Sequence, residues 1–195
     1  NEEGGEISRF YGYVADGIFQ NQTEVNAHTD EYGTVIQPNA QPGDIRFKDL
    51  NHDGKLDDND KTFIGNAFPD LMVGINARLA WKNIDFAANF YGTIGNDVYN
   101  TTKGRYSGVS GENVYAGTYN ASWHGEGTSY DLPRLSYNDA NQNWTRVSSF
   151  YVEDGSYLRC KQLQIGYTLP KKWTKKISLR LSFSAQNPFT ITGYS

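Results

Sequence analysis

The sequence is short of the residues that build disulfide-rich proteins, zinc sites and membrane helices. It has one cysteine, one methionine and three histidines among 195 residues. Cys160 stands alone, which excludes a disulfide framework, and His28, His52 and His124 are too far apart for zinc-ligand spacing. No apolar run approaches about 18 residues and no signal segment is recognised, so no transmembrane helix is expected. A transmembrane β-strand is still allowed, because it needs only ~10 residues with one apolar face.

Catalytic signatures are also missing. The sequence has no Gly-x-Ser-x-Gly elbow and no glycine-rich phosphate loop between a strand and a helix. Cys160 falls inside an expected strand, where packing is commoner than nucleophilic chemistry. Glu126, Asp131, Glu153 and Asp154 are carboxylates, but their spacing along the chain does not set the separation that glycosidase chemistry needs. We therefore predict that the protein is not an enzyme.

What is abundant is glycine and tyrosine. The chain has 20 Gly and 14 Tyr, while hydrophobic residues make up only 37%. This composition favours many turns and short strands, and no helical periodicity exceeds two turns. The predicted fold class is therefore all-β. The small net charge of −4 argues against nucleic acid as a partner.

An acidic stretch over Asp49–Asp60 is the most distinctive motif. Oxygen-bearing side chains fall at its first, third, fifth, ninth and twelfth positions, and Gly54 is sixth, where a calcium loop turns sharply. The predicted Ca²⁺ ligands are Asp49, Asn51, Asp53, the backbone carbonyl of Lys55, Asp57 and Asp60. Asp60 departs from the usual Glu and has a shorter reach. The alternative is an Asx-rich solvated turn without metal. No helical pattern flanks the stretch, so we expect a structural ion rather than a calcium sensor.

Two long strands are predicted on either side of a turn at Lys82-Asn83. Every second residue from Leu71 to Trp81 is apolar, and Ile84 to Phe90 continues this alternation. Each strand has about ten residues, whereas strands usually have about five or six. The hairpin fits either half of a soluble sandwich or a pair of barrel strands with the apolar face toward lipid. Further strands are expected over 163–169 and 178–186. The apolar face changes side near Lys161, which indicates either a bulge or the edge of a membrane band.

The segment 94–150 is interpreted as a long loop of extracellular type. It is rich in Gly, Asn and Ser with little periodicity, and a connection this long is usually functional. Aromatic rings are spread along it, and exposed rings among polar residues suit recognition of a sugar or a peptide. The candidate ligand-binding residues are Trp123, Tyr130, Tyr137 and Trp144. The alternative is that these rings only pack the loop against its neighbours.

Several motifs, taken in order, resemble a known family: the SusC/RagA-type TonB-dependent transporters of the outer membranes of Bacteroidetes. The matching stretches are 17–20, 42–60, 64–66, 69–70, 91–92, 95–100, 153–159, 163–170 and 186–194. The resemblance covers most of the chain and is weakest over 101–150. Cys160 departs from it, since we expect a residue other than cysteine there.

The resemblance implies a fold and a set of partners. Members carry an N-terminal plug and a barrel of about 22 strands. They work with a SusD-like lipoprotein lid, import oligosaccharides or peptides and are powered through TonB. Residues 1–195 would then be a C-terminal portion of the barrel in outer-membrane lipid, built of long antiparallel hairpins and long loops. Segment 44–66 would be the calcium-loop-like part, and the whole would contact ligand without catalysis.

A few such strands cannot close a barrel, so in isolation they must hide their apolar faces from water. The faces of 71–81, 84–90 and 179–185 could pack on one another as a sandwich or against a second copy of the chain, and we expect the sandwich. The alternative function is a calcium-stabilised carbohydrate-binding β-module of a secreted protein. The length of the strands and the flanking rings of Trp81 and Tyr91 favour the membrane.

Overall fold

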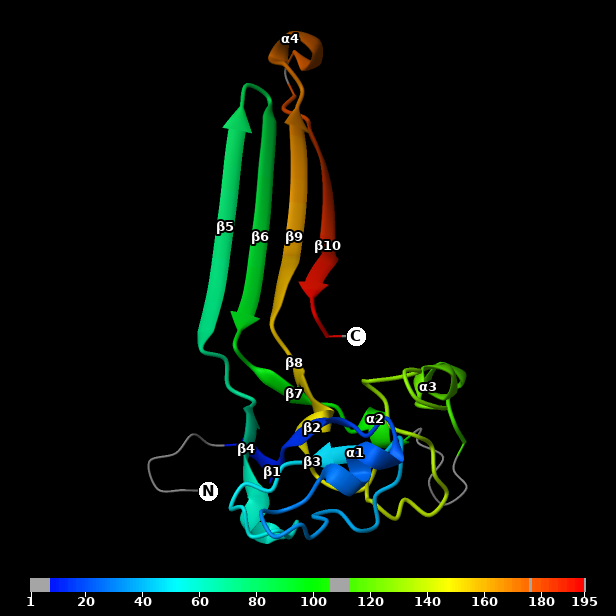
Figure 1. Ribbon diagram of the computed structural model, residues 1–195. Coiled ribbons are helices and arrows are strands. Elements are labelled where there is room, and N and C mark those ends of the chain that lie inside the picture. The colour runs from blue at the N-terminus through cyan, green and yellow to red at the C-terminus, as the bar shows by residue number, and fades with distance from the viewer. Residues whose placement is uncertain (1–7, 106–112, 176, 195) are drawn as a thin grey trace. The chain divides into compact units, whose positions relative to one another are not determined.

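The computed structural model describes residues 8–105, 113–175 and 177–194, and these fold mainly into antiparallel strands (Figure 1). The all-β prediction is confirmed. The chain divides into two compact units. The sheet unit contains residues 67–97 and 154–195, and the loop unit contains residues 1–66 and 98–153. No helix in the described residues is long and apolar enough to cross a membrane.

The sheet unit is one layer of four long strands. They are β5 (Leu71–Trp81), β6 (Ile84–Ile94), β9 (Tyr157–Thr168) and β10 (Arg180–Thr192). Their order across the sheet is β10-β9-β6-β5, and every neighbouring pair is antiparallel (Figure 1). A short helix, α4 (Lys171–Thr174), lies in the connection between β9 and β10.

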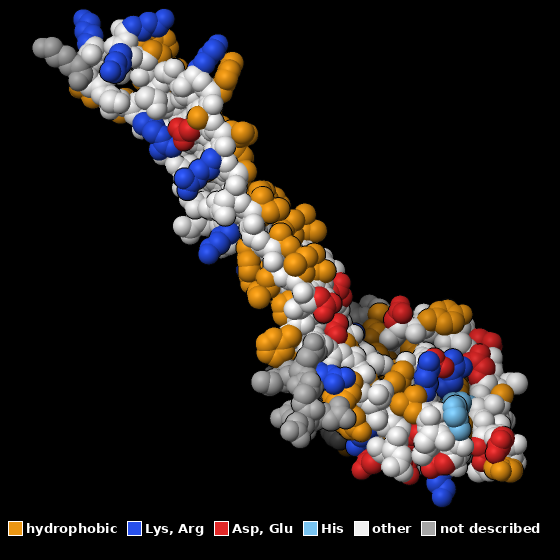
Figure 2. Space-filling view, turned by 90° about the vertical axis from the view of Figure 1, so that its left-hand side faces the viewer, with side chains coloured by type: hydrophobic (Ala, Val, Ile, Leu, Met, Phe, Trp, Pro, Cys, Tyr) orange, Lys and Arg blue, Asp and Glu red, His pale blue; other side chains and the backbone are white. Residues whose placement is uncertain are grey.

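The strand register gathers the apolar residues on one face. Leu79 lies opposite Phe86, which lies opposite Ile165, which in turn lies opposite Phe183. Because alternate residues of a strand point to opposite faces, this register extends the apolar alternation across all four strands. In the edge-on view of Figure 2, hydrophobic side chains follow one side of the middle of the sheet. The hairpin predicted around Lys82 is therefore confirmed.

Two bulges keep the apolar face continuous. The bulge in β9 skips Lys161, so that Gln162 pairs with Asn89 and Cys160 with Phe90. The bulge in β10 removes Asn187 and Pro188 from the register, and Asn187 has a φ of 48°. A proline has no N–H for the ladder and is tolerated at such a position. The bulge expected near Lys161 is confirmed, whereas β10 runs on to Thr192 rather than ending at residue 186.

The expected sandwich packing is wrong. All four strands pair side by side in one sheet, which puts their apolar faces on the same side, so these faces cannot pack on one another. The side chains stay bare: Leu79 is 69% exposed, Trp81 66% and Phe183 69%. The sheet therefore presents a wide apolar surface that the chain itself does not cover.

The loop unit has short elements and a mostly irregular chain. Its paired strands are β1 (Arg9–Tyr13) with β4 (Lys61–Asn66) and β2 (Ala15–Ile18) with β3 (Ile45–Phe47). A further short pair is β7 (Asp97–Tyr99) with β8 (Val152–Asp154). The helices are α1 (Gln22–Ala27), η1 (Asp58–Asp60), α2 (Thr102–Arg105), α3 (Ala116–Ala121) and η3 (Ser149–Tyr151).

Two small apolar clusters support the loop unit. One contains Tyr13, Ile45 and Phe47, and the other contains Phe19, Val25 and Ala40. Each cluster has three buried members in the described residues, so we expect polar contacts to order much of this unit alongside these small cores.

Candidate functional site

The acidic loop is closed from inside by two buried carboxylates. Asp60 is fully buried and Asp49 is 9% exposed. The carboxylate of Asp49 accepts hydrogen bonds from the N–H groups of His52 (2.7 Å) and Gly54 (2.9 Å). One carboxylate oxygen of Asp60 accepts from the N–H of Leu50 at 2.9 Å. Both carboxylates therefore hold the backbone of the turn, as in an Asx-rich loop.

The second half of the loop is a capping box. The side chain of Asp57 accepts from the N–H of Asn59 at 2.8 Å, and Asp60 accepts from the N–H of Asp57 at 2.8 Å. Gly54 has a φ of 81°, and a Cβ there would overlap the carboxylate of Asp30. The sharp turn that the sequence predicted at Gly54 thus requires glycine for two separate reasons.

The predicted calcium ligands are engaged in hydrogen bonds. Asp53 accepts from the N–H of Lys55 at 3.0 Å and from the side-chain amide of Asn51 at 2.9 Å. In the described parts of the chain, no three His, Cys, Asp or Glu side chains converge as a metal site would need. This arrangement does not present a cation-binding set. Calcium binding stays a prediction; each ionised carboxylate has about four lone-pair sites, so the N–H hydrogen bonds leave room for a cation as well.

A buried polar cluster that the sequence analysis missed joins β3 to the long loop. Asp44 is completely buried, and its carboxylate accepts from the Nε of Arg134 at 2.6 Å and from the Nδ2 of Asn143 at 2.8 Å. The N–H of Gln41 donates to the other oxygen at 2.8 Å. A buried carboxylate is tolerated when it is paired and hydrogen-bonded in this way.

Side-chain amides continue this cluster along β3. Gln37 donates to the carbonyl of Ile45 at 3.0 Å and accepts from the N–H of Phe47 at 2.7 Å. The side chain of Asn143 accepts from the N–H of Ile45 at 2.9 Å, and the side chain of Asn141 donates to the carbonyl of Ile45 at 2.9 Å. The amides thus occupy the hydrogen-bonding positions that a neighbouring strand would fill. The Asp and Asn residues concentrated over 139–143 were the one sequence feature that could have indicated this buried polar cluster.

The two tryptophans among the candidate ligand-binding residues make internal contacts, Trp144 buried and Trp123 partly exposed. Trp144 is 5% exposed, its indole N–H donates to the carbonyl of Arg134, and its ring packs edge-on against Phe150. The indole N–H of Trp123 donates to the side chain of Gln20 at 3.3 Å. In this conformation Trp144 offers no surface to a ligand.

The two tyrosines are presented differently. Tyr130 is 67% exposed and Tyr137 is 68% exposed. Both lie in the loop unit, and both are free to contact a solute. Ligand binding by Trp123, Tyr130, Tyr137 and Trp144 stays a prediction, and the two tyrosines are its more exposed members.

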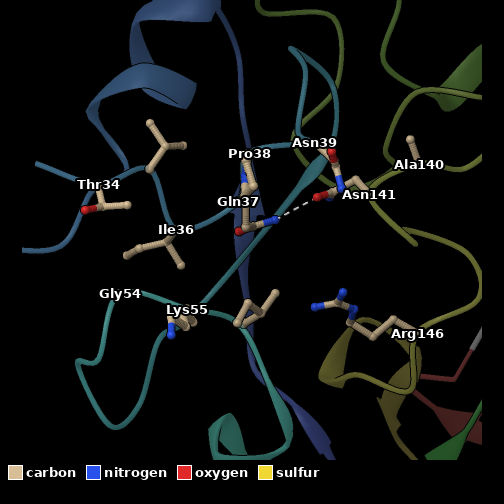
Figure 3. Close-up of a pocket in the computed structure, with 12 residues that line it drawn as sticks. Thr34, Ile36, Gln37, Pro38, Asn39, Gly54, Lys55, Ala140, Asn141 and Arg146 are labelled. Atoms are coloured by element: carbon tan, nitrogen blue, oxygen red, sulfur yellow. Dashed lines mark hydrogen bonds between the residues drawn. The ribbon is translucent and has the colours of Figure 1, made fainter.

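A cavity of about 430 Å³ opens between the acidic loop and the buried amides (Figure 3). Gly54 and Lys55 line one side, and Gln37 and Asn141, joined by a 2.9 Å hydrogen bond, line another. Arg146 completes the wall. Its guanidinium lies 4.6 Å from the ring centre of Tyr13 and 5.0 Å from that of Phe47, and burial lowers its pKa.

The sheet unit offers two further features for function. Its polar face carries Asn89 and Gln162, whose side chains meet at 3.4 Å, and the pair Asp85 and Arg180, whose Oδ1 and Nε atoms are 3.0 Å apart. Strand β5 pairs only with β6, and β10 only with β9, in the described residues. The outer edges of the sheet are therefore open for pairing.

Comparisons with known proteins were made for sequence and for structure. No family model matches the chain. It is 34% identical to TonB-dependent receptor P3 of Formosa agariphila over 98% of its length, and 30% identical to receptor P26 of the same organism over 86%. It is also 25% identical to TonB-dependent receptor SusC of Bacteroides thetaiotaomicron over 98%. The chain spans only 16 to 20% of the length of these relatives.

Solved structures agree at the level of the fold. The RagAB peptide transporter matches 95% of the chain with a TM-score of 0.67 at 20% identity, covering 19% of the matched chain. The RagAB peptide importer in its open-open state matches with a TM-score of 0.65 over the same share. The long sheet, the motifs and the sequence identities agree, and the chain belongs to the TonB-dependent receptors of the SusC/RagA type.

Proposed function

We propose that the chain is part of an outer-membrane TonB-dependent receptor that takes up nutrients, either oligosaccharides or peptides. In this role the sheet unit supplies four neighbouring strands of the transmembrane barrel, with the apolar face toward lipid and the polar face toward the lumen. The observation that carries the proposal is the bare apolar face of strands that are 11 to 13 residues long. A barrel strand needs about 9–11 residues to cross the hydrocarbon layer.

The exposed apolar side chains favour transfer of the sheet from water into lipid. Full burial of one large apolar side chain is worth about 1.5–3 kcal/mol. Several on this face are about half to two-thirds exposed: Leu71, Ile75, Leu79, Trp81, Leu181, Phe183 and Ile191. In water such a contiguous surface is an aggregation hazard. In a bilayer the same surface is removed from water and contacts the lipid chains.

The open sheet edges support the same conclusion. In hydrocarbon every backbone N–H and C=O must be satisfied inside the protein, so an unpaired strand edge does not occur there. The outer edges of β5 and β10 therefore pair with further strands. Since the chain spans at most 20% of the relatives' length, the rest of such a receptor supplies those strands.

The loop unit is assigned the ligand-contacting role. Its exposed rings, Tyr130 and Tyr137, suit contact with a sugar or peptide. A SusD-like lipoprotein lid and TonB are the partners proposed for the whole receptor. The solved relatives are named for peptide transport and a curated relative is SusC, so both substrate classes stay in the proposal. Catalysis has no part in it.

Growth of the producing bacterium tests the proposal. A strain lacking the receptor is grown on oligosaccharides and on peptides as sole nutrients, and the wild-type gene should restore growth on one class. Ile75→Arg should fail to restore it, because an arginine facing mid-membrane lipid costs about 2–4 kcal/mol. Asn76→Arg, the next residue and on the polar face, should restore it. No growth defect in the deletion strain, or equal rescue by both variants, would refute the proposal.

A further inference from the structure

Charge is divided unevenly between the two units. Residues 67–97 and 154–195 carry nine Lys and Arg against four Asp and Glu, while the remaining residues carry nine against eighteen. The sheet unit is thus basic although the chain has a net charge of −4. Most of its positive residues belong to one end of the sheet, where the β5–β6 turn and the β9–β10 connection lie (Figure 1).

Hydrogen bonds hold the two connections at this end together. The N–H of Thr168 donates to the carbonyl of Asn83 at 2.8 Å, and the side-chain amide of Asn83 donates to the carbonyl of Thr168 at 2.6 Å. Lys82 therefore stands beside the segment that carries Lys171 and Lys172. All three lysines are exposed, and none takes part in a salt bridge within the described residues.

This basic end, defined as Lys82, Lys171, Lys172 and Lys175, also carries two exposed tryptophan rings. Trp81 and Trp173 are each 66% exposed, and the ammonium of Lys82 lies 4.5 Å from the ring centre of Trp81. Trp81 belongs to the apolar face, where it ends β5. Tryptophan rings are favoured where hydrocarbon gives way to headgroups. The lysines thus lie at the level of the lipid phosphates if the apolar face is in the membrane.

We infer that the basic end binds the phosphate of an anionic glycerophospholipid at the membrane surface. This inference rests on the proposed membrane-spanning role of the sheet. Lysine clusters next to a membrane-embedded segment attract anionic headgroups, and each contributes roughly a fivefold gain in affinity. Unpaired lysines and bordering tryptophans suit a headgroup better than the charged surface of another protein, because the tryptophans need an apolar phase on one side.

Titration of the detergent-purified receptor with a short-chain lipid tests the inference. Dioctanoyl phosphatidylglycerol is the probe, dioctanoyl phosphatidylcholine is the neutral comparison, and bound lipid is counted by native mass spectrometry. Phosphatidylglycerol should bind more tightly to the wild type, and K171Q/K172Q should weaken it about 25-fold, fivefold for each lysine. K171R/K172R should retain binding. K161Q, which removes an exposed lysine from the bulge of β9, should leave it unchanged.

The outcomes separate the inference from the proposed function. A receptor that extracts with the membrane and resists heat unfolding in detergent, yet binds both lipids equally, overturns the inference alone. Equal weakening by K161Q and K171Q/K172Q overturns it as well, because the effect would then be one of general charge. A receptor found outside the membrane fraction overturns the proposed function together with the inference.

Discussion

Removing the charge of Asp44 should loosen the attachment of β3 to the long loop. Asp44→Asn keeps the shape of the side chain but places an amide where Arg134 and Asn143 now donate. The buried partner of the Asp44–Arg134 ion pair loses its charge, and breaking a buried ion pair typically costs about 3–5 kcal/mol. Since the side chain of Arg134 is 22% exposed and can turn toward water, we expect about 3 kcal/mol.

Native-state hydrogen exchange measures this change directly in the receptor. A loss of 3 kcal/mol in local opening free energy speeds exchange roughly 100-fold, at about 1.4 kcal/mol for each factor of ten. The acceleration should appear in peptides covering 44–48 and 139–146. Asp16→Asn is the matched control, since its ion pairs with Arg46 and Lys48 are exposed and should be worth under about 1 kcal/mol. Equal effects of the two substitutions would refute the structural role of the buried cluster.

Three further predictions concern the loop unit. Gly43→Ala should lower the stability of the loop unit by about 1–3 kcal/mol, because φ is 89° and a Cβ would overlap the Trp123 ring. Gly33→Ala is the control and should cost less, because its φ is 84° but a Cβ there meets open space. Thermal melts of the two variants measure the difference. Burial lowers the pKa of His28 below 6.5. Its contribution to stability is therefore full above about pH 6.5 and is lost as the pH falls through the folded-state pKa. His28→Gln should make the melting temperature depend less on pH between about 5 and 7.5. If the acidic loop binds Ca²⁺, the melting midpoint should rise with calcium and fall with chelator, whereas an unchanged midpoint would refute binding.

The sheet was largely predictable because its signal is local. Alternation from Leu71 to Trp81 sets which residues share a face, and the turn at Lys82-Asn83 sets the hairpin. The sandwich prediction failed because alternation identifies an apolar face without showing what covers it. The extension of β10 through Pro188 was missed, since a proline normally argues against a strand and only the bulge allows one.

The loop unit was much less predictable, because its order comes from contacts between distant residues. Asp44 and Arg134 are separated by 90 positions, and nothing in the 42–60 motif that contains Asp44 marks it as the partner of Arg134. The acidic stretch was found at once from its spacing, yet spacing does not show whether an oxygen faces an ion or a backbone N–H. Exposure likewise separated Tyr130 and Tyr137 from the buried Trp144, which composition could not do.

The most direct test of the account is which face of β5 meets lipid. Nitroxide labels are placed one at a time at Ile75, Asn76, Arg78 and Leu79 in the membrane-reconstituted receptor, after Cys160 and any cysteine in the rest of the receptor are replaced by alanine. Collision rates with oxygen and with a water-soluble nickel complex are then compared. Labels at Ile75 and Leu79 should collide with oxygen and be shielded from nickel, while those at Asn76 and Arg78 should show the reverse. Equal access of nickel to all four positions would contradict a lipid-facing sheet.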